Sequence, residues 1–318
     1  MKTYLLTGGA GFIGSHLTEA LLERGHRVIC IDDFNDYYNP RYKHENIELF
    51  KVHKNYILIK VDIADWDKLQ SAFGQFENID AIIHIAARAG VRPSLKFPQL
   101  YTRVNVNGTQ NLLELARQNG IKKFIFASSS SVYGNQKKVP FSEKDSVDRP
   151  ISPYAATKRA GELLMSTYHH LYDIDTVCLR FFTVYGPKGR PDMAPYLFTE
   201  WIWNDKELKK FGTGETRRDY TYIDDIIDGV LATLDKNFGF KIINLGNSNT
   251  VTLNEFINIV ESALGKKAKI KQLPMQPGDV NQTYSDITKA KQLLNFNPQT
   301  GFADGMNKFI KWYKDNRT

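Results

Sequence analysis

The chain has 318 residues, of which 42% are hydrophobic and 24% are charged. These fractions are typical of a folded globular protein and exclude a disordered, collagen-like or coiled-coil chain. Lys and Arg outnumber Asp and Glu by 42 to 35, and this net charge of +7 favours anionic partners without selecting among a nucleotide, a nucleic acid and a membrane.

Short apolar segments alternate with amphipathic ones through the first 181 residues. The pattern predicts strands at residues 4–7, 28–31, 56–61, 81–86, 123–128 and 176–181. It predicts helices at residues 13–23, after Asp65, at 104–118 and at 152–171. Strands that alternate with helices indicate parallel strands joined by right-handed crossovers. The expected fold is therefore α/β, with a doubly wound parallel sheet.

The pattern changes after Gly186, where several prolines and glycines indicate a loop-rich stretch. A strand is predicted at 241–245, and helices are predicted at 252–264 and 288–294. We expect residues 1–186 to form a nucleotide-binding domain and residues 187–318 to form mainly a smaller C-terminal α/β lobe. The strand at 241–245 can return to the first sheet, so the boundary is not expected to be a single cut.

The cysteines and the lengths of the apolar runs indicate the cellular compartment. Cys30 and Cys178 lie in apolar runs without a CxxC spacing, so we expect buried thiols and neither a disulfide framework nor a zinc site. The N-terminal apolar run carries glycines by residue 8, which is unlike a signal peptide. No apolar run approaches the roughly 20 residues that span a bilayer. A cytoplasmic location is expected.

A GxxGxxG motif stands between the first predicted strand and the first predicted helix, at residues 8–14. In this context it indicates a Rossmann-type dinucleotide site. Gly8 permits the tight turn, Gly11 lets the backbone approach the pyrophosphate, and Gly14 lets the helix pack closely on the strand. The helix N-terminus supplies free N–H groups for the phosphates. Asp32 ends the second strand, where its carboxylate suits a ribose and would repel a 2′-phosphate, so NAD is favoured over NADP.

Further cofactor contacts are expected after the third and fourth strands. Asp62 can lie near the adenine, with a buried N-cap of the next helix as the alternative. Ala86 and Ala87 are small enough for the chain to run along the cofactor, whereas His84 is expected to be a core histidine. The residues expected at the cofactor are Gly8, Gly11, Phe12, Ile13, Gly14, Asp32, Asp62, Ile63, Ala86, Ala87, Tyr154 and Lys158.

Tyr154 and Lys158 lie four residues apart near the start of a predicted helix, and therefore on one face of it. A tyrosine has a pKa of roughly 10 and is a poor base at neutral pH. A lysine ammonium one turn away, together with a positive nicotinamide, lowers that pKa. The pair predicts a general base matched to the working pH.

Five motifs together resemble the extended short-chain dehydrogenase/reductase family that acts on nucleotide sugars: GGAGFIGSH, SSSSVYG, SPYAATK, RRDYTYIDD and PGD. The resemblance covers the whole chain. It implies that Ser129 hydrogen-bonds the reacting sugar oxygen, so that Tyr154, Lys158 and Ser129 are catalytic. Dehydratases of the family carry an Asp-Glu pair at the positions of Ser130 and Ser131, and its UDP-glucuronate decarboxylases carry an acidic residue in this segment. The neutral hydroxyls here point to redox at sugar C4 and its reversal.

The segment at residues 182–193, FTVYGPKGRPDM, is similar to the one in UDP-glucuronate 4-epimerases. There a Thr and an Arg seven residues later, here Thr183 and Arg190, hold the sugar carboxylate. Galactose-type epimerases usually have Asn at the position of Thr183 and no counterpart of Arg190. A planar guanidinium suits a planar carboxylate, whereas a solvated loop cation is the alternative for Arg190.

The resemblance implies further substrate contacts. Arg218 matches an arginine that binds the diphosphate, Asp279 a residue that contacts the uridine ribose, and Asn105 an asparagine near the reacting sugar. Arg92 is a further candidate, and surface-charge or capping roles are the alternatives for all four. The residues expected at the substrate are Arg92, Asn105, Ser129, Ser130, Thr183, Arg190, Arg218 and Asp279. No metal is expected.

The implied activity is C4 epimerisation between UDP-glucuronate and UDP-galacturonate through a 4-keto sugar, with tightly bound NAD. The alternatives are a UDP-glucose or UDP-N-acetylhexosamine 4-epimerase and, from another class, a non-catalytic NAD-sensing Rossmann protein. The dispersed positive charge is not typical of nucleic-acid binding, and no membrane partner is expected. In the family, helices like those at 104–118 and 152–171 form a four-helix interface, so a homodimer is expected.

Overall fold

The computed structural model describes residues 1–274 and 280–317, and the chain divides into two compact units. The first unit comprises Met1–Gly134, Ser146–Arg180 and Ile227–Ile243. The second comprises Asn135–Asp145, Phe181–Ile226 and Asn244–Thr318. Each unit is therefore assembled from segments that are distant in the sequence.

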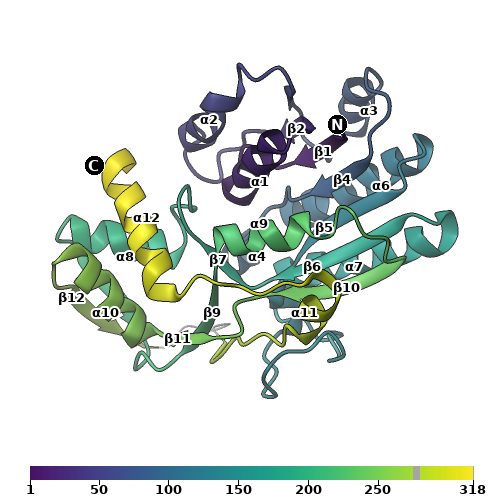
Figure 1. Ribbon diagram of the computed structural model, residues 1–318. Helices are drawn as coiled ribbons and strands as arrows, with labels where there is room; N and C mark the ends of the chain where they lie inside the picture. The colour runs from purple at the N-terminus through teal and green to yellow at the C-terminus, as the bar shows by residue number, and fades with distance from the viewer. Residues whose placement is uncertain (275–279, 318) are drawn as a thin grey trace. The chain divides into compact units, whose positions relative to one another are not determined.

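A seven-stranded sheet lies at the centre of the first unit, in the order β10-β6-β5-β4-β1-β2-β3 (Figure 1). Its strands are β1 (Thr3–Thr7), β2 (Arg27–Asp32), β3 (Tyr56–Lys60), β4 (Ala81–His84), β5 (Lys123–Ser129), β6 (Asp175–Phe181) and β10 (Phe240–Leu245). Across the part of the sheet that runs β5-β4-β1-β2-β3, each strand pairs in parallel with its neighbours. The order reverses between β1 and β4, which is the Rossmann arrangement. The predicted α/β fold is confirmed, and the predicted return strand joins this sheet as β10.

Helices cover the sheet of the first unit. They are α1 (Phe12–Glu23), α2 (Arg41–Ile47), α3 (Trp66–Phe73), α4 (Val91–Lys96), α5 (Pro98–Thr102), α6 (Gly108–Gln118) and α7 (Pro153–Tyr172). Leu69 of α3, Leu112 of α6 and Met165 of α7 pack in one buried cluster with strand residues such as Ile29 and Phe124. Burial beneath helices explains why the strands read as nearly continuous apolar runs.

Three short helical turns interrupt these elements. They are η1 (Glu48–Phe50), the π-helical turn η2 (Arg103–Asn107) and η3 (Ser130–Tyr133). The helix predicted at 104–118 is therefore α-helical only from Gly108. The strand predicted at 81–86 ends at His84, and the two residues after it bond to Thr7 rather than continuing the ladder.

Among its described residues, the second unit contains two small sheets, ordered β11-β9-β7 and β12-β8. The strands are β7 (Thr183–Tyr185), β8 (Glu207–Phe211), β9 (Arg217–Tyr222), β11 (Thr250–Thr252) and β12 (Lys269–Leu273). The helices are α8 (Ala194–Trp203), α10 (Leu253–Leu264), α11 (Thr288–Leu294) and α12 (Phe302–Arg317). Helix α9 (Ile223–Leu231) begins in the second unit and ends in the first.

The predicted loop-rich stretch is wrong from residue 194 onward. Pro195 stands in the first turn of α8, where the missing N–H of proline breaks no helical hydrogen bond. Helix α12 was also not predicted, although Phe302, Met306 and Phe309 recur at helical spacing on its buried side. Aromatic rings from β9, α10 and α12 make the core here: Tyr220 lies 4.8 Å from Phe302 and 5.3 Å from Phe256 between ring centroids.

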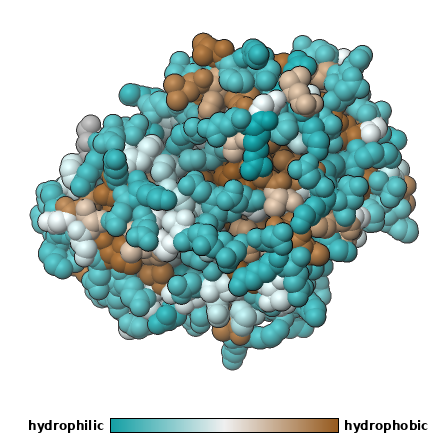
Figure 2. Space-filling view, viewed as in Figure 1, coloured by the Kyte–Doolittle hydropathy of each residue, from teal (hydrophilic) through white to brown (hydrophobic). Residues whose placement is uncertain are grey.

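Hydrophilic side chains cover most of the face seen in Figure 2, and apolar ones form smaller groups between them. Through residues 1–274 and 280–317, no helix combines the length and the apolar character needed to cross a membrane. Cys30 and Cys178 are free and buried, as predicted.

Candidate active site

The glycine motif forms a tight turn between β1 and α1. Gly8 has φ of +72°, and a Cβ there would lie 2.8 Å from the backbone nitrogen of Ala86. A Cβ on Gly14 would lie 2.0 Å from the carbonyl oxygen of Gly8, so only glycine allows α1 to pack this closely on the turn. Helix α1 begins at Phe12, and its N-cap is Gly11, which has no side chain to bond the first N–H groups. This helix end fits a bound phosphate.

Asp32 closes one side of this turn from the end of β2. Its side chain is 5% exposed and accepts hydrogen bonds from the backbone N–H groups of Ala10 (3.2 Å) and Phe34 (2.9 Å). The Lys43 ammonium of α2, itself buried, lies 3.4 Å away. Burial raises the pKa of Asp32, and Lys43 and the N–H donors oppose the rise. The carboxylate is thus held beside the glycine turn, where an adenosine ribose would meet it.

Asp62 bonds a backbone N–H and an arginine side chain, and its contact with the adenine stays a prediction. One carboxylate oxygen accepts from the N–H of Ala64 (2.9 Å) and the other from Nη2 of Arg103 (2.7 Å). The N-cap of α3 is Asp65, whose carboxylate accepts from the N–H of Lys68. The alternative role of Asp62 as a buried N-cap is therefore wrong, because α3 begins three residues too late for it.

The end of β4 faces the glycine turn. Ala86 donates its N–H to the carbonyl and the hydroxyl oxygens of Thr7, at 3.1 and 3.2 Å. Ala87 is half-buried and Ile63 is buried. His84 is 1% exposed, and its two ring nitrogens bond the hydroxyls of Thr7 and Thr109. The prediction of a core histidine is confirmed.

Tyr154 and Lys158 lie in the first turns of α7, which Ser152 caps by accepting from the N–H of Ala155. Tyr154 is half-buried and packs edge-on against Tyr101, with ring centroids 6.2 Å apart. Lys158 is 3% exposed and donates from Nζ to the carbonyl oxygen of Ala127 at 2.6 Å. Burial lowers the pKa of Lys158 to about 7, and Glu162 opposes this shift.

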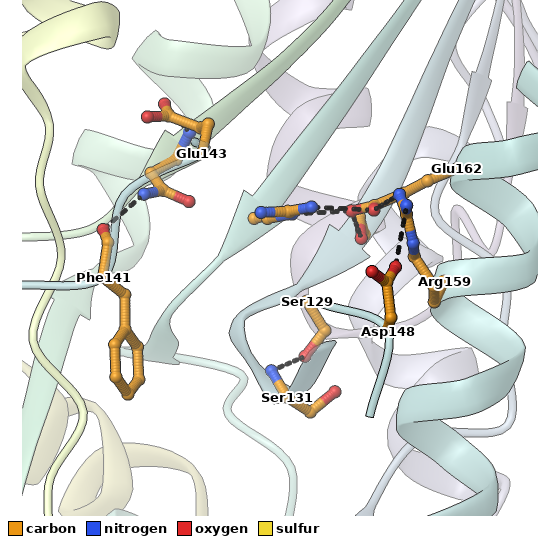
Figure 3. Close-up of polar contacts among 10 residues, drawn as sticks. Ser129, Ser131, Phe141, Glu143, Asp148, Arg159 and Glu162 are labelled. Atoms are coloured by element: carbon orange, nitrogen blue, oxygen red, sulfur yellow. Dashed lines mark hydrogen bonds and ion pairs between the residues drawn. The ribbon is translucent and has the colours of Figure 1, made fainter. Parts of the chain in front are cut away.

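Ser129 ends β5 and is the N-cap of η3. Its Oγ accepts from the N–H of Ser131 at 3.2 Å (Figure 3). A serine hydroxyl has one proton to donate besides its acceptor lone pairs, so the O–H of Ser129 can still be offered to a sugar oxygen. Ser130 follows it as the first residue of η3.

Two further expected residues of the first unit differ in exposure. Asn105 is buried, and its amide donates to the carbonyl of Arg88 and to Oγ1 of Thr157, both at 3.0 Å. Its carbonyl accepts from the N–H of Arg88 at 2.8 Å. Asn105 thus joins the segment after β4 to α7, and a contact to the sugar stays a prediction. Arg92 lies exposed on α4.

The buried lysine predicts a pH-dependent change in stability. Its pKa of about 7 lies below the 10.5 of an exposed lysine, so between these values the unfolded chain binds more protons and stability rises with pH. Lys158→Met lacks this rise. Between pH 7 and pH 10, the unfolding free energy of the wild type should rise by about 3 kcal/mol more than that of the variant, as measured in urea with NAD removed. If the unfolding free energies of the two proteins change in parallel with pH, the lowered pKa of Lys158 is contradicted.

In the second unit, Thr183 and Arg218 lie on neighbouring strands. Thr183 begins β7 and pairs with Tyr220 of β9, two residues after Arg218. Because side chains alternate along a strand, Thr183 and Arg218 project from the same face of this sheet. Nη1 of Arg218 donates to the carbonyl of Arg217 at 2.8 Å. The expected contact at Asp279 lies outside the described residues.

Arg190 lies between β7 and α8, where its guanidinium holds a carboxylate. Nε donates to Oδ1 of Asp192 at 2.9 Å and Nη2 to Oδ2 at 2.5 Å. The Arg190 side chain is 19% exposed, and its contact with a sugar carboxylate stays a prediction. The contact with Asp192 shows that this guanidinium accommodates a carboxylate along two donors.

Sequence reasoning missed Asp219, the residue after Arg218. It is fully buried, and its carboxylate accepts from the N–H groups of Asn247 (2.8 Å), Ser248 (3.1 Å) and Ser285 (3.0 Å). Burial raises its pKa, and these bonds oppose the rise. Asp219 thereby anchors the strand that carries Arg218. An aspartate inside a strand-like run, next to two arginines, was the available signal.

The first unit thus has a Rossmann-like fold with a glycine turn after β1 and a Tyr-Lys pair at the start of α7, the pattern of a class of dinucleotide-binding enzymes. The family model described as GDP-mannose 4,6 dehydratase matches residues 5–309. This chain belongs to that family, the extended short-chain dehydrogenases/reductases that include nucleotide-sugar epimerases and dehydratases.

Known relatives narrow the comparison. A UDP-glucuronate 4-epimerase of Thermodesulfobacterium geofontis is 46% identical over 317 residues, which cover 99% of this chain and 97% of that protein. The crystal structure of UDP-glucuronic acid 4-epimerase from Bacillus cereus, in complex with UDP-glucuronic acid and NAD, has a TM-score of 0.91 at 39% identity, covering 98% of this chain and 99% of that one. The UDP-glucose 4-epimerase of Thermotoga maritima, with UDP-glucose, has a TM-score of 0.91 at 29% identity, covering 99% and 100%.

Proposed function

We propose that this protein interconverts UDP-glucuronate and UDP-galacturonate by epimerisation at C4, with NAD as a tightly bound cofactor. The observation that carries the substrate assignment concerns Arg190, seven residues after Thr183. Its guanidinium holds the Asp192 carboxylate along two donors, and the same two donors suit the carboxylate of a uronate. The relatives named as UDP-glucuronate 4-epimerases support the same assignment. The neutral Ser130 and Ser131 argue against dehydration.

The residues of the first unit fit NAD. The glycine turn leaves no room for a Cβ on Gly8 or Gly14, the start of α1 offers N–H groups, and the Asp32 carboxylate suits ribose hydroxyls. The first unit would hold the cofactor and the second the UDP-sugar, with the division near residue 186 as part of the proposal. When bound, NAD accepts hydride from sugar C4 and returns it to the opposite face.

Tyr154 acts as the base that takes the proton from O4 of the sugar. The Lys158 ammonium, one helical turn away, favours the phenolate form of Tyr154, and the Ser129 hydroxyl donates a hydrogen bond to the same sugar oxygen. After the 4-keto sugar has turned about its diphosphate, Tyr154 returns the proton. The sequence of steps leaves all protein groups in their starting state.

The 4-keto uronate is a β-keto acid and loses carbon dioxide readily. The loss is easiest when the bond from C5 to the carboxylate lies parallel to the π-system of the ketone. Thr183 and Arg190 hold the carboxylate and keep that bond out of alignment. Fixing the carboxylate thus serves both substrate binding and protection of the intermediate.

The test is the product formed from UDP-glucuronate, read by proton NMR. Formation of UDP-galacturonate, with UDP-glucose and UDP-N-acetylglucosamine as poor substrates, is the expected result. Preferential turnover of a neutral UDP-hexose would instead identify a galactose-type epimerase. No turnover of any of these sugars by NAD-loaded protein would favour an NAD sensor.

Cofactor retention gives a second prediction. Because NAD is regenerated in every turnover, it has no need to leave, and it should copurify with the protein at substantial occupancy. Denaturing the purified protein and quantifying released nucleotides by chromatography measures this. A nucleotide-free protein that requires added NADP for activity would contradict the assignment of Asp32.

A homodimer is part of the proposal. Leu163 and Leu171 on α7 are 53% and 57% exposed and lie eight residues apart, on one helix face. Exposed leucines at this spacing suit a helix-to-helix interface. Leu163→Glu should convert the dimer to a monomer in light scattering at micromolar concentration. Leu49→Glu, at an exposed leucine outside these helices, is the control; a monomeric wild type would refute the dimer.

A further inference from the structure

A buried group of charged side chains lies along α7, beyond Tyr154 and Lys158. Glu162 is one helical turn past Lys158, so the three side chains share one helix face. Glu162 is fully buried, and Arg180 of β6 is 1% exposed. Arg180 donates from Nε and Nη2 to the two oxygens of Glu162, at 2.8 and 2.9 Å. The pair connects α7 to the sheet next to the proposed catalytic residues.

Two more groups hold the Glu162 carboxylate. Ser128, the neighbour of Ser129, donates from Oγ to Oε1 at 2.6 Å, and Arg159 donates from Nη1 to Oε2 at 3.2 Å. Arg159 also lies 3.7 Å from the largely exposed Asp148 (Figure 3). The Arg180 guanidinium lies 4.7 Å from the ring centroid of Tyr133. The carboxylate therefore cannot turn without breaking several bonds.

A buried ion pair is weak as a source of stability, because removing both charges from water costs about as much as their attraction returns. Apolar side chains could connect α7 to β6 equally well. A charged pair at this place therefore calls for a role that depends on charge. Lys158, a buried cation on the same helix as Glu162, supplies a target for that role.

The groups around Lys158 leave Glu162 as its source of negative charge. On α7 this group is Glu162, one turn away; β4 contributes His84, β5 the Ala127 carbonyl and the Phe126 ring, and β6 Cys178. Arg159 and Arg180 are cations that bond Glu162 itself. Burial holds the pKa of His84 well below its usual value and that of Cys178 well above, so both are neutral. Glu162 raises the pKa of Lys158 against the effect of burial.

We propose that Glu162 is a positioning residue of the reaction: its carboxylate, clamped by Arg180 and Ser128, holds Lys158 as an ammonium beside Tyr154. Arg180 tempers this effect, because it is a cation that competes for the same carboxylate. The inference rests on the proposed function in one respect, since it assigns the charge of Lys158 to activation of Tyr154 as a base.

The experiment measures the ionisation of Tyr154 by its phenolate absorbance near 295 nm in the NAD-loaded protein. Each variant is prepared with and without Tyr154→Phe, and the difference isolates Tyr154. Glu162→Gln removes the negative charge in nearly the same shape. A smaller fraction of Lys158 is then protonated to stabilise the phenolate. The pKa of Tyr154 should therefore rise by about one to two units. Arg180→Met should move it in the opposite direction.

A matched control separates charge from packing. Glu114→Gln removes a carboxylate that bonds the same helix at Tyr168, about 15 Å along the axis from Lys158 at 1.5 Å per residue. Its ionisation curve should match the wild type. Shifts in the same direction for Glu162→Gln and Arg180→Met, or no shift in either, would show a merely structural pair and overturn the proposal.

Folding is checked by thermal unfolding and NAD content, because breaking a buried pair is strongly destabilising. If a single variant fails to fold, Glu162→Gln combined with Arg180→Met leaves no uncompensated member of the pair. The pKa of Tyr154 in this double variant should still rise, because Glu162 is the charge that acts on Lys158. The rise should be smaller than in Glu162→Gln alone. No rise in the folded double variant overturns the proposal.

Kinetics on UDP-glucuronate add a second readout. At pH 7, kcat of Glu162→Gln should fall about tenfold and recover at higher pH, with KM unchanged. An equal loss of kcat at every pH would count against the inference. The ionisation measurement uses no sugar, so it tests the role of Glu162 even if UDP-glucuronate proves not to be the substrate.

Discussion

Tyr154→Phe should lower turnover of UDP-glucuronate by about 10²–10⁴-fold, the typical contribution of a positioned proton transfer. The change removes the phenolic oxygen and almost no volume, and the half-buried ring can keep its edge-on contact with Tyr101. The affinity for the UDP-sugar should therefore barely change. The measurement is kcat from the NMR progress curve, with the dissociation constant of UDP-glucuronate from calorimetry.

Tyr168→Phe is the matched control, because it removes another phenol from α7, one that bonds Glu114 at a distance from Lys158. Its turnover should stay within a few-fold of the wild type. Near-normal activity of Tyr154→Phe would mean that another residue is the base. A loss of UDP-sugar affinity as large as the loss of kcat would instead indicate a binding role.

Arg190→Ala should weaken UDP-glucuronate by roughly ten- to hundredfold while UDP itself binds as before. Hydrogen bonds to charged groups are worth about 1.5–3 kcal/mol, and the substrate carboxylate would lose its two-donor partner. Arg190→Lys keeps the charge without the planar fork and should rescue only part of the loss. Calorimetric titration with UDP-glucuronate, UDP-glucose and UDP measures all three affinities.

Asp192 sharpens this test, because its carboxylate occupies the Nε and Nη2 edge of Arg190. Asp192→Asn removes the competing charge. UDP-glucuronate should therefore bind a few-fold more tightly to this variant than to the wild type. Arg190→Ala also lets the carboxylate of the keto intermediate turn, and carbon dioxide and a 4-keto-pentose should appear. If Arg190→Ala binds UDP-glucuronate like the wild type and releases no carbon dioxide, the substrate assignment falls back to a neutral UDP-hexose.

The sheet of the first unit was predictable because the patterns of its strands and helices are local. The continuous apolar run of a buried strand and the 3.6-residue period of a helix are visible within a dozen residues. The second unit was not predicted to the same extent. Its strand β7 is only three residues long, and Pro195, which indicates a loop, stands in the first turn of α8, where it is compatible with a helix.

The candidate site divides in the same way. The sequence alone was enough to predict the turn at Gly8, the close approach at Gly14 and the shared helix face of Tyr154 and Lys158, since each depends on a few consecutive residues. It could not predict that Asn105 bonds Thr157, 52 residues later, or that Asp219 bonds two loops, one at Asn247 and Ser248 and one at Ser285. Contacts of this kind depend on which elements become neighbours.

By itself the sequence determined the class of this protein, because the glycine turn, the Tyr-Lys spacing and the Thr183–Arg190 segment are local patterns with local geometry. Only the tertiary structure decided the electrostatics of the site. Lys158 has a lowered pKa because α7 packs it against β5, out of water. Glu162 meets Arg180 because α7 and β6 lie together in the fold. A charge acquires its strength from the solvent that packing excludes, and exclusion of solvent is a property of the assembled chain.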